Sequence, residues 1–503
     1  MIPRPVHIPL GPIDHLAPPF YPTISLYLPI KNGVSTAKVF QVLQEGLHRT
    51  FVQLPWLGGQ VQLSSSDTPG WRPGQLEIVH DPVDINGLKP YQLKFNELPV
   101  ESYESYDELK ESGFPIEAFA YESLIWAPFI ADVRKGADVM VAQANFIPGG
   151  CILTVAVNHS ASDATGLSHV LNFWAENCSD VQLLTSDEPK VLPPEISDRS
   201  ILERIWAEEG KHISFQDTRS EIWKILQVDP RLILSSEPSN STVPSSDSKD
   251  IEIQKAPELS SAPRRIGKSA VFYIAPANIA KLREECDPVP GTTSVSVNDA
   301  ICSLIWRSLM KARAAKLNKV VTLEEARLGM AVNGRYHFSP SLPPDYLANL
   351  AFGYMSSLPL VDLISPETTI SSVASLIRDS ARDINTKGAL METYALARQI
   401  PDFGVFLSQG PAKSGYTMWI TSLLAAPFSS ICFGDVVFSN GGKPEAFRPV
   451  VGVKLAHDLG LDVVIIMPRK SHGGVEFVTF QSEEEMALLL KDLEFDRHAM
   501  LVS

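Results

Sequence analysis

The chain has 503 residues, 44% of them hydrophobic, and a chain of this length is expected to form more than one domain. Lys and Arg total 43 and Asp and Glu total 58, so the formal net charge at pH 7 is −15. Nonspecific nucleic-acid binding depends on basic side chains that neutralise phosphates, so nucleic acid is not an expected partner of this acidic chain.

The five cysteines are widely spaced and include no CxxC pair, so the sequence indicates neither a zinc site nor a disulfide framework. The first residues lack the basic region and apolar stretch of a signal peptide. No run approaches the ~18 apolar residues that a membrane span needs. We therefore expect a cytoplasmic protein with no membrane partner and no metal.

The first part of the chain predicts a helix followed by a short strand. Residues 35–55 place apolar side chains at helical spacing between Val39 and Phe51, and a proline ends the pattern. Residues 60–63 then fit a strand.

The segment from residue 139 to residue 177 has the clearest pattern. Residues 139–147 and 151–158 predict two strands joined by a Pro-Gly-Gly turn, and residues 166–176 predict a helix. Between the second strand and the helix, residues 159–165 form a short polar loop that we expect to be exposed. A short loop on a rigid scaffold is a common position for catalytic residues.

A linker is predicted near the middle of the chain. Residues 235–250 contain seven serines and two prolines, a composition that is typical of mobile segments. We therefore predict an N-terminal lobe over residues 1–195, a crossover linker over residues 196–265 and a C-terminal lobe over residues 266–503.

Strands and helices alternate after the crossover. Helices are predicted over residues 276–285, 296–315, 369–385 and 481–493. Strands are predicted over residues 270–273, 327–332, 436–438, 450–453, 462–467 and 474–480. The pattern predicts an α/β or α+β protein with two comparable lobes.

The loop after the second buried strand reads His159-Ser-Ala-Ser-Asp163, an HxxxD pattern. Histidine can remove a proton near neutral pH, because its unperturbed pKa is about 6.5. Acyl transfer from a thioester to an alcohol needs such a base and a donor that stabilises the oxyanion. The spacing alone leaves a second interpretation open, in which His159 only caps the end of the strand.

The residues around this motif resemble the BAHD acyltransferases. The stretch HSASDATG, which begins at His159, is similar to the family's HxxxD region. The greatest similarity is to the fungal branch, which includes trichothecene 3-O-acetyltransferase. Further stretches resemble family segments in the same order along the chain, namely residues 9–27, 43–60, 296–307, 332–349 and 460–492. The resemblance spans nearly the whole chain.

The resemblance implies two lobes of similar fold, like those of chloramphenicol acetyltransferase, with mixed sheets, flanking helices and a channel between the lobes. It implies that His159 is the general base midway along this channel, with acyl-CoA entering from one face and the acceptor from the other. It also implies that Asp163 points away from the reaction and pairs with Arg335 to hold the loop. The family is usually monomeric, so a monomer is expected.

A second family signature, DFGWG, is degraded in this chain. Its counterpart is the Cys-Phe-Gly-Asp stretch at residues 432–435, which lacks the leading Asp and the Trp. The signature is structural in the family, so the departure leaves the expected chemistry in place. The Asp-Phe-Gly stretch at residues 402–404 lies too early in the chain and is interpreted as a coincidence.

Two further groups are candidates for the site. The family has a hydroxyl near the reacting carbonyl, and Thr421 is a candidate for that oxyanion donor; a strand hydroxyl bonded to its own backbone is the alternative. Arg264, Arg265 and Lys268 form a compact basic cluster. This cluster could contact the phosphates of CoA, or it could be a solvated linker end.

The sequence thus predicts an acyl-CoA-dependent acyltransferase. We expect an O-acetyltransferase that moves an acetyl group from acetyl-CoA to a hydroxyl of a small secondary metabolite through a ternary complex, without a permanently bound cofactor. An acceptor with an amine in place of the hydroxyl is an open alternative. The acceptor pocket is expected to include Phe352, Phe406, Trp419 and Phe428.

Two alternatives stay open. The first is a condensation-type transferase that takes its acyl group from a carrier protein. The motif of those enzymes is HHxxxDG, and here Asn158 replaces its first His and Ala164 its Gly. The second is a cyclase or binding protein that uses the same fold without acyl transfer.

Overall fold

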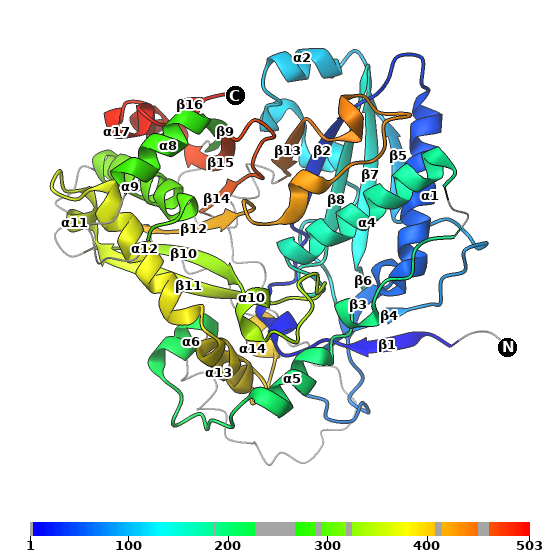
Figure 1. The fold of residues 1–503 in the computed structure, drawn as a ribbon, viewed down its shortest axis with the longest axis horizontal. Helices are drawn as coiled ribbons and strands as arrows, with labels where there is room; N and C mark the ends of the chain where they lie inside the picture. Colours follow the sequence, from blue (N-terminus) through cyan, green and yellow to red (C-terminus); the bar gives the residue numbers. More distant parts are fainter. Residues whose placement is uncertain are drawn as a thin grey trace, which may run out of the picture.

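The computed structural model describes residues 4–185, 188–226, 267–286, 294–317, 324–407, 415–450 and 462–503. These residues form two lobes, each built on β-sheet with flanking helices (Figure 1). The two-lobed, mixed α/β fold predicted from the sequence is confirmed. Among the described residues, no helix combines the length and the apolar character of a bilayer-crossing segment.

The N-terminal lobe is centred on a five-stranded sheet. In spatial order its strands are β13 (Ala446–Pro449), β2 (Thr23–Pro29), β8 (Gly150–Val157), β7 (Met140–Ile147) and β5 (Leu93–Glu97). Every residue of β7 and β8 is buried. Two long helices, α1 (Thr36–Gln53) and α4 (Ala164–Leu183), share one apolar core with this sheet. The indole of Trp174 on α4 joins them by donating to the carbonyl oxygen of Leu43 on α1, at 2.9 Å.

Shorter elements complete this lobe. A second sheet contains, in spatial order, β1 (Val6–Pro9), β4 (Leu76–His80), β3 (Gln60–Leu63) and β6 (Ala137–Asp138). The short helices are η1 (Ile13–Leu16), η2 (Pro55–Gly58), α2 (Tyr106–Glu111), η3 (Ile116–Ala118), α3 (Tyr121–Leu124) and η4 (Pro194–Ile196). The η1 turn and η4 both lie close to the lobe boundary through their contacts with residues 346–350.

The C-terminal lobe is built on a seven-stranded sheet. Its strands, in spatial order, are β11 (Ala351–Pro359), β10 (Glu325–Asn333), β12 (Thr417–Ser422), β14 (Val463–Ile466), β15 (Val475–Ser482), β9 (Gly267–Ile274) and β16 (Met500–Leu501). The sheet is mixed, because β10, β12 and β14 run parallel and the other neighbours run antiparallel.

Helices surround this sheet (Figure 1). The longer ones are α8 (Pro276–Glu285), α9 (Val297–Leu317), α12 (Ile370–Ile384) and α13 (Lys387–Ala397). The shorter ones are α10 (Arg335–Phe338), α11 (Leu360–Ile364), α14 (Gly404–Leu407), α16 (Glu483–Leu489) and α17 (Leu493–Asp496). The remaining short helices, η5 (Pro427–Ser430) and η6 (Asn440–Gly442), precede β13 and lie near the N-terminal lobe.

The crossover, residues 196–265, is predicted from the sequence to be a linker, but part of it forms helices. Its first part forms α5 (Ile201–Glu209) and α6 (Ser220–Leu226), whose apolar side chains are buried in the core of the C-terminal lobe. The predicted mobile segment, residues 235–250, lies outside the described residues. In addition, β13 comes from the predicted C-terminal lobe but pairs with β2 in the N-terminal sheet.

Most predicted elements are present, and a few differ for local reasons. Helix α8 has the predicted bounds, whereas α4 begins at Ala164 because Asp163 caps it. The strand predicted at residues 436–438 is a turn, in which Phe438 makes only an isolated bridge to Ile30. The strand predicted at residues 450–453 lies almost entirely outside the described residues. The last predicted helix is shorter, because β15 continues to Ser482.

Candidate active site

The HxxxD loop connects the end of β8 to the start of α4 and turns tightly. The Asn158 side chain accepts a hydrogen bond from the Ser160 N–H at 3.1 Å, and its carbonyl oxygen accepts from the Ala161 N–H at 2.8 Å. The Asp163 carboxylate then accepts from the Gly166 N–H at 2.9 Å and caps α4. A carboxylate in this position satisfies one of the unpaired N–H groups at the helix start.

The prediction that this loop is exposed is wrong. Four of the seven residues predicted in it expose at most 5% of their surface, namely Ser160, Ala161, Ser162 and Asp163. The loop is buried because segments from both lobes cover it, a tertiary effect that local polarity does not predict. Of the residues from Asn158 to Asp163, His159 alone is partly accessible.

His159 is positioned by its backbone and by an aromatic neighbour. Its N–H donates to the carbonyl oxygen of Phe20 at 2.9 Å, and the two rings lie edge to face with centroids 5.3 Å apart. The Nδ1 atom of His159 is buried and has no hydrogen-bond partner among the described residues. Burial lowers the pKa of His159 below its ordinary value. The imidazole is therefore neutral at pH 7 and able to accept a proton.

Asp163 is bonded to Arg335 rather than to the His159 ring. The two N···O distances of the ion pair are 2.9 and 3.0 Å, and both side chains are buried. The Leu350 N–H donates to the same carboxylate at 2.9 Å. Burial alone would raise the pKa of Asp163, but the Arg335 charge and these hydrogen bonds outweigh it, so the pKa lies below its usual value.

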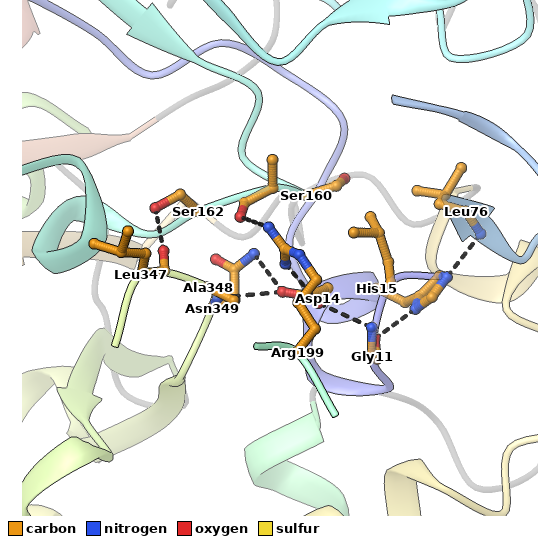
Figure 2. Close-up of polar contacts among 12 residues, drawn as sticks. Gly11, Asp14, His15, Leu76, Ser160, Ser162, Arg199, Leu347, Ala348 and Asn349 are labelled. Atoms are coloured by element: carbon orange, nitrogen blue, oxygen red, sulfur yellow. Dashed lines mark hydrogen bonds and ion pairs between the residues drawn. The ribbon is translucent and has the colours of Figure 1, made fainter. Parts of the chain in front are cut away.

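A second buried carboxylate, Asp14, lies close to the same loop and is bonded to Arg199 and Asn349 (Figure 2). It accepts from Arg199 Nη1 at 2.9 Å, from the Gly11 N–H at 2.9 Å, and from the backbone N–H and side-chain Nδ2 of Asn349 at 3.2 and 3.1 Å. Arg199 and Asn349 also bind the loop, because Arg199 Nη2 donates to the Ala161 carbonyl and Asn349 Nδ2 to the His159 carbonyl.

Sequence reasoning missed this second carboxylate group. The pair Asp14 and His15 was visible in the sequence, but adjacency in sequence says little about what either side chain contacts. Asn349 is the last residue of one stretch that resembles the family, and this was the one signal that pointed to it. No local pattern distinguishes Arg199 from other arginines.

His15 is a buried histidine whose two ring nitrogens both form hydrogen bonds with backbone groups. Its Nε2 accepts from the Leu76 N–H at 3.0 Å, and its Nδ1 therefore carries the proton and donates to the Gly11 carbonyl oxygen at 2.8 Å (Figure 2). The ring stacks on Phe403 with centroids 4.0 Å apart. Burial lowers the pKa of His15 to about 4, so the ring is neutral at pH 7.

The other predicted site residues are not brought against His159 by any described contact. Thr421 is exposed on β12, where its backbone pairs with Ile465 of β14. Lys268 lies on β9 and forms an exposed ion pair with Glu483 at 3.5 Å. The rest of that basic cluster, Arg264 and Arg265, lies outside the described residues.

The four aromatic residues predicted to line an acceptor pocket are mostly core residues. Phe352 and Phe406 are buried in the core of the C-terminal lobe, and Phe428 is buried in the core of the N-terminal lobe. Only Trp419 is partly accessible. Aromatic residues are often buried for packing, and composition alone does not separate that use from a pocket.

The counterpart of the degraded signature contacts the far end of α4. Phe433 is buried against Trp174, and the Gln182 amide donates to the Phe433 carbonyl oxygen. The Gln182 side-chain oxygen accepts from the N–H groups of Val436 and Val437 at 3.1 and 3.0 Å. Gly434 has φ +86°, and a Cβ there would collide with the Gln182 side chain. The segment packs as a structural support of α4.

Of the side chains in this site, the His159 imidazole is the one that can accept a proton from a substrate. Within the described ranges, no three His, Cys, Asp or Glu side chains are grouped to hold a metal ion. The nearby carboxylates of Asp14 and Asp163 each accept four hydrogen bonds, including those from an arginine, and are therefore fully used. A neutral, partly accessible imidazole remains as the group that can act on a substrate.

Two family models match the chain. One, described as the Transferase family, matches residues 131–496, and another, described as the trichothecene 3-O-acetyltransferase-like N-terminal domain, matches residues 20–178. The first match covers more than half of the chain and includes His159, Asp163 and Arg335.

Similar proteins include fungal enzymes. An isocyanide synthase-NRPS hybrid of Aspergillus fumigatus is 30% identical over 98% of this chain, which spans only 31% of that protein. An eremophilane O-acetyltransferase of Penicillium roqueforti is 25% identical, with 98% of each chain covered. The crystal structure of F. sporotrichioides TRI101 complexed with coenzyme A and T-2 has a TM-score of 0.69 at 19% identity, and covers 99% of this chain and 100% of that one. This structural likeness establishes the shared fold.

Proposed function

The chain belongs to the Transferase family, the family of the BAHD acyltransferases, and from this membership we propose that it transfers an acetyl group from acetyl-CoA to a hydroxyl of a small secondary metabolite. His159 is the general base of this reaction. The observation that carries the proposal is a neutral, partly accessible His159 in a buried loop whose Asp163 is fully engaged by other donors.

In the proposed mechanism, acetyl-CoA and the acceptor bind together. His159 removes the proton of the acceptor hydroxyl as its oxygen attacks the thioester carbonyl carbon, which forms a tetrahedral intermediate. The carbon–sulfur bond then breaks, and the proton held by His159 passes to the CoA thiolate, which leaves as a thiol. An oxyanion donor is required, and the exposed hydroxyl of Thr421 is the candidate for this role.

The proposed substrates follow from the relatives. An eremophilane O-acetyltransferase is similar over its whole length, and TRI101 of Fusarium sporotrichioides is a trichothecene 3-O-acetyltransferase whose structure contains coenzyme A and T-2. We therefore expect a hydroxylated terpenoid or a compound of similar size as the acceptor. We also expect the enzyme to act as a cytoplasmic monomer, with acetyl-CoA as a co-substrate and no permanently bound cofactor.

The proposal is tested with His159→Ala and a matched control, His472→Ala, which removes an exposed histidine of the C-terminal lobe. Transfer from radiolabelled acetyl-CoA to a panel of hydroxylated terpenoids should fall by about 10²–10⁴-fold in His159→Ala and stay unchanged in the control. Binding of acetyl-CoA, measured by calorimetry, should be similar in all three proteins. Undiminished transfer by His159→Ala would contradict the role of base, and absence of acetyl-CoA binding would favour a cyclase or binding protein.

A carrier-protein donor is the second candidate. The observation that favours it is the 30% identity to part of an isocyanide synthase-NRPS hybrid. Acetyl groups loaded on a purified carrier protein can be offered in place of acetyl-CoA in the same assay. Transfer from the carrier alone would establish this alternative, whereas transfer from free acetyl-CoA alone would exclude it.

A further inference from the structure

We propose that Asn349 is a positioning residue for His159, which it connects to the buried ion pair of Asp14 and Arg199. This inference rests on the proposed function, because it takes His159 as the base. Asn349 lies in the C-terminal half of the chain, just before β11, whereas Asp14 belongs to η1 and His159 to the loop after β8. The contact therefore crosses between the lobes.

The Asn349 carboxamide uses both of its N–H bonds on this connection. Nδ2 donates to the His159 carbonyl oxygen at 2.9 Å and to Asp14 Oδ1 at 3.1 Å. The backbone N–H of Asn349 also donates to Asp14 Oδ1, at 3.2 Å. Asn349 exposes 3% of its surface, so water does not replace these hydrogen bonds when they are lost.

The ion pair behind Asn349 fixes the same loop at a second point. Arg199 Nη1 donates to Asp14 at 2.9 Å, and Arg199 Nη2 donates to the Ala161 carbonyl oxygen at 2.5 Å (Figure 2). The Arg199 side chain exposes 5% of its surface and that of Asp14 exposes 4%. The group thus holds the backbone at His159 and at Ala161, two residues apart.

The backbone contact matters because the His159 ring has few contacts of its own. Its Nδ1 has no hydrogen-bond partner among the described residues, and Asp163 is bonded elsewhere. The position of the imidazole therefore depends on its backbone and on packing against Phe20. A catalytic group needs to be placed within ~0.5 Å of its productive position. Loosening the backbone at His159 is expected to lower the rate of the chemical step.

Asn349 also differs from the ion pair of Asp163 and Arg335. That pair anchors the start of α4, four residues after the histidine, whereas Asn349 contacts His159 directly. The charged groups around His159 are Asp163 with Arg335 and Asp14 with Arg199, and each is paired. An Asn349→Ala variant leaves all four charges in place, so a change at His159 reports position rather than a lost charge.

The test compares Asn349→Ala with Asn172→Ala. Asn172 is a matched control, because its Nδ2 also donates to two carbonyl oxygens, those of Ser168 at 2.7 Å and Pro427 at 2.8 Å, away from His159. Both variants should unfold at a lower temperature than the wild type. Only Asn349→Ala should lower kcat, by about 10- to 100-fold, with the KM for acetyl-CoA within about twofold of the wild type.

A second readout does not depend on acyl transfer. Diethyl pyrocarbonate modifies neutral imidazoles, so the pH dependence of His159 modification, followed by peptide mass spectrometry, reports its pKa. Burial lowers the pKa of His159, and the Asn349 side chain is among the groups that raise it against this effect, so Asn349→Ala should move the half-modification pH further below the ordinary histidine value. Asn172→Ala should leave it unchanged. Arg199→Lys, which keeps the charge opposite Asp14, provides a milder variant that should shift in the same direction.

An unchanged half-modification pH in both Asn349→Ala and Arg199→Lys would overturn the positioning role, as would equal kcat values in Asn349→Ala and Asn172→Ala. Failure of the proposed function has a different signature. In that case the wild type would transfer no acetyl group, or His159→Ala would retain transfer. The shift in the modification of His159 would still decide the positioning role.

Discussion

Asp163 and Arg335 form a buried two-point ion pair, with N···O distances of 2.9 and 3.0 Å, that connects the HxxxD loop of the N-terminal lobe to α10 of the C-terminal lobe. The Arg335 side chain is fully buried, and that of Asp163 exposes 5% of its surface. A charge left alone in such a place has no water to solvate it. Removal of either member alone is therefore expected to destabilise the folded protein.

We predict that Asp163→Ala destabilises the fold by about 3–5 kcal/mol, because it leaves the Arg335 guanidinium buried without its counter-charge. Transfer activity should fall with it, since the loop that carries His159 loses its anchor. Urea denaturation followed by circular dichroism measures the free energy of unfolding.

Asp132→Ala is the matched control for this prediction, because it removes an aspartate whose ion pair with Lys135 is exposed. Its unfolding midpoint should stay close to that of the wild type. Wild-type stability in Asp163→Ala combined with lost activity would contradict a structural role and would favour a direct effect of Asp163 on catalysis.

The pH dependence of the reaction gives a second prediction. Burial lowers the pKa of His159 in the folded protein, so the base stays neutral below the ordinary histidine value of about 6.5. Protonation removes the base, and kcat/KM therefore falls as the pH drops through the pKa of His159. The midpoint of this acid limb should lie below pH 6.5. Steady-state rates at constant ionic strength, with an acceptor that does not titrate, locate it. A midpoint above pH 6.5 is incompatible with the buried histidine described here.

The residues that carry the proposed chemistry were predictable, because they lie in a recognisable order. The HxxxD motif placed His159 and Asp163 between a buried strand and a helix, and the resemblance to the BAHD family supplied Arg335 as the partner of Asp163. The structure brings Asp163 and Arg335 together. The roles of these residues in catalysis and in loop stability stay predictions.

The second half of the site was not predictable for a physical reason. Asp14 and Asn349 are 335 residues apart in sequence, and their hydrogen bonds form only when the lobes come together. Isolated polar residues create no periodicity, so pattern reasoning does not reveal them. The same holds for the burial of the loop, because the polarity of its sequence alone predicts an exposed loop.

Two misplacements in the fold have similar causes. The predicted linker extends from the Ser-rich segment to residues before it that form a helix. Ile201, Leu202 and Ile205 recur at helical spacing in the sequence and are buried in α5. Strand β13 is only four residues long, and its pairing with β2 follows from tertiary contacts rather than from its own sequence.

His15 yields a prediction about stability. Its pKa is about 4 in the folded protein and about 6.5 when unfolded, so between these values the unfolded chain binds a proton that the folded protein does not. The stabilisation is fully present above pH 6.5 and is lost as the pH falls towards 4, an effect on the order of 3 kcal/mol. A His15→Gln variant lacks this titration. Its free energy of unfolding should therefore approach that of the wild type between pH 7 and pH 4.5. Parallel curves for the two proteins would refute the assignment.

The last prediction concerns Gln182, which supports the Cys-Phe-Gly-Asp segment from the far end of α4. With a rise of 1.5 Å per residue, Gln182 lies roughly 27 Å along the helix from Ala164, the residue that follows the HxxxD motif. Gln182→Ala removes the acceptor of the Val436 and Val437 N–H groups and the donor to the Phe433 carbonyl oxygen.

We expect Gln182→Ala to lower the free energy of unfolding by about 1–3 kcal/mol, because part of this segment is buried and its polar groups lose their partners. Values of kcat and KM should stay within about twofold of the wild type, since the change is far from His159. Gln41→Ala, an exposed substitution on α1, is the control for loss of a glutamine and should change neither quantity. A large loss of kcat in Gln182→Ala without loss of stability would mean that the degraded signature acts on the reaction rather than on the packing of α4.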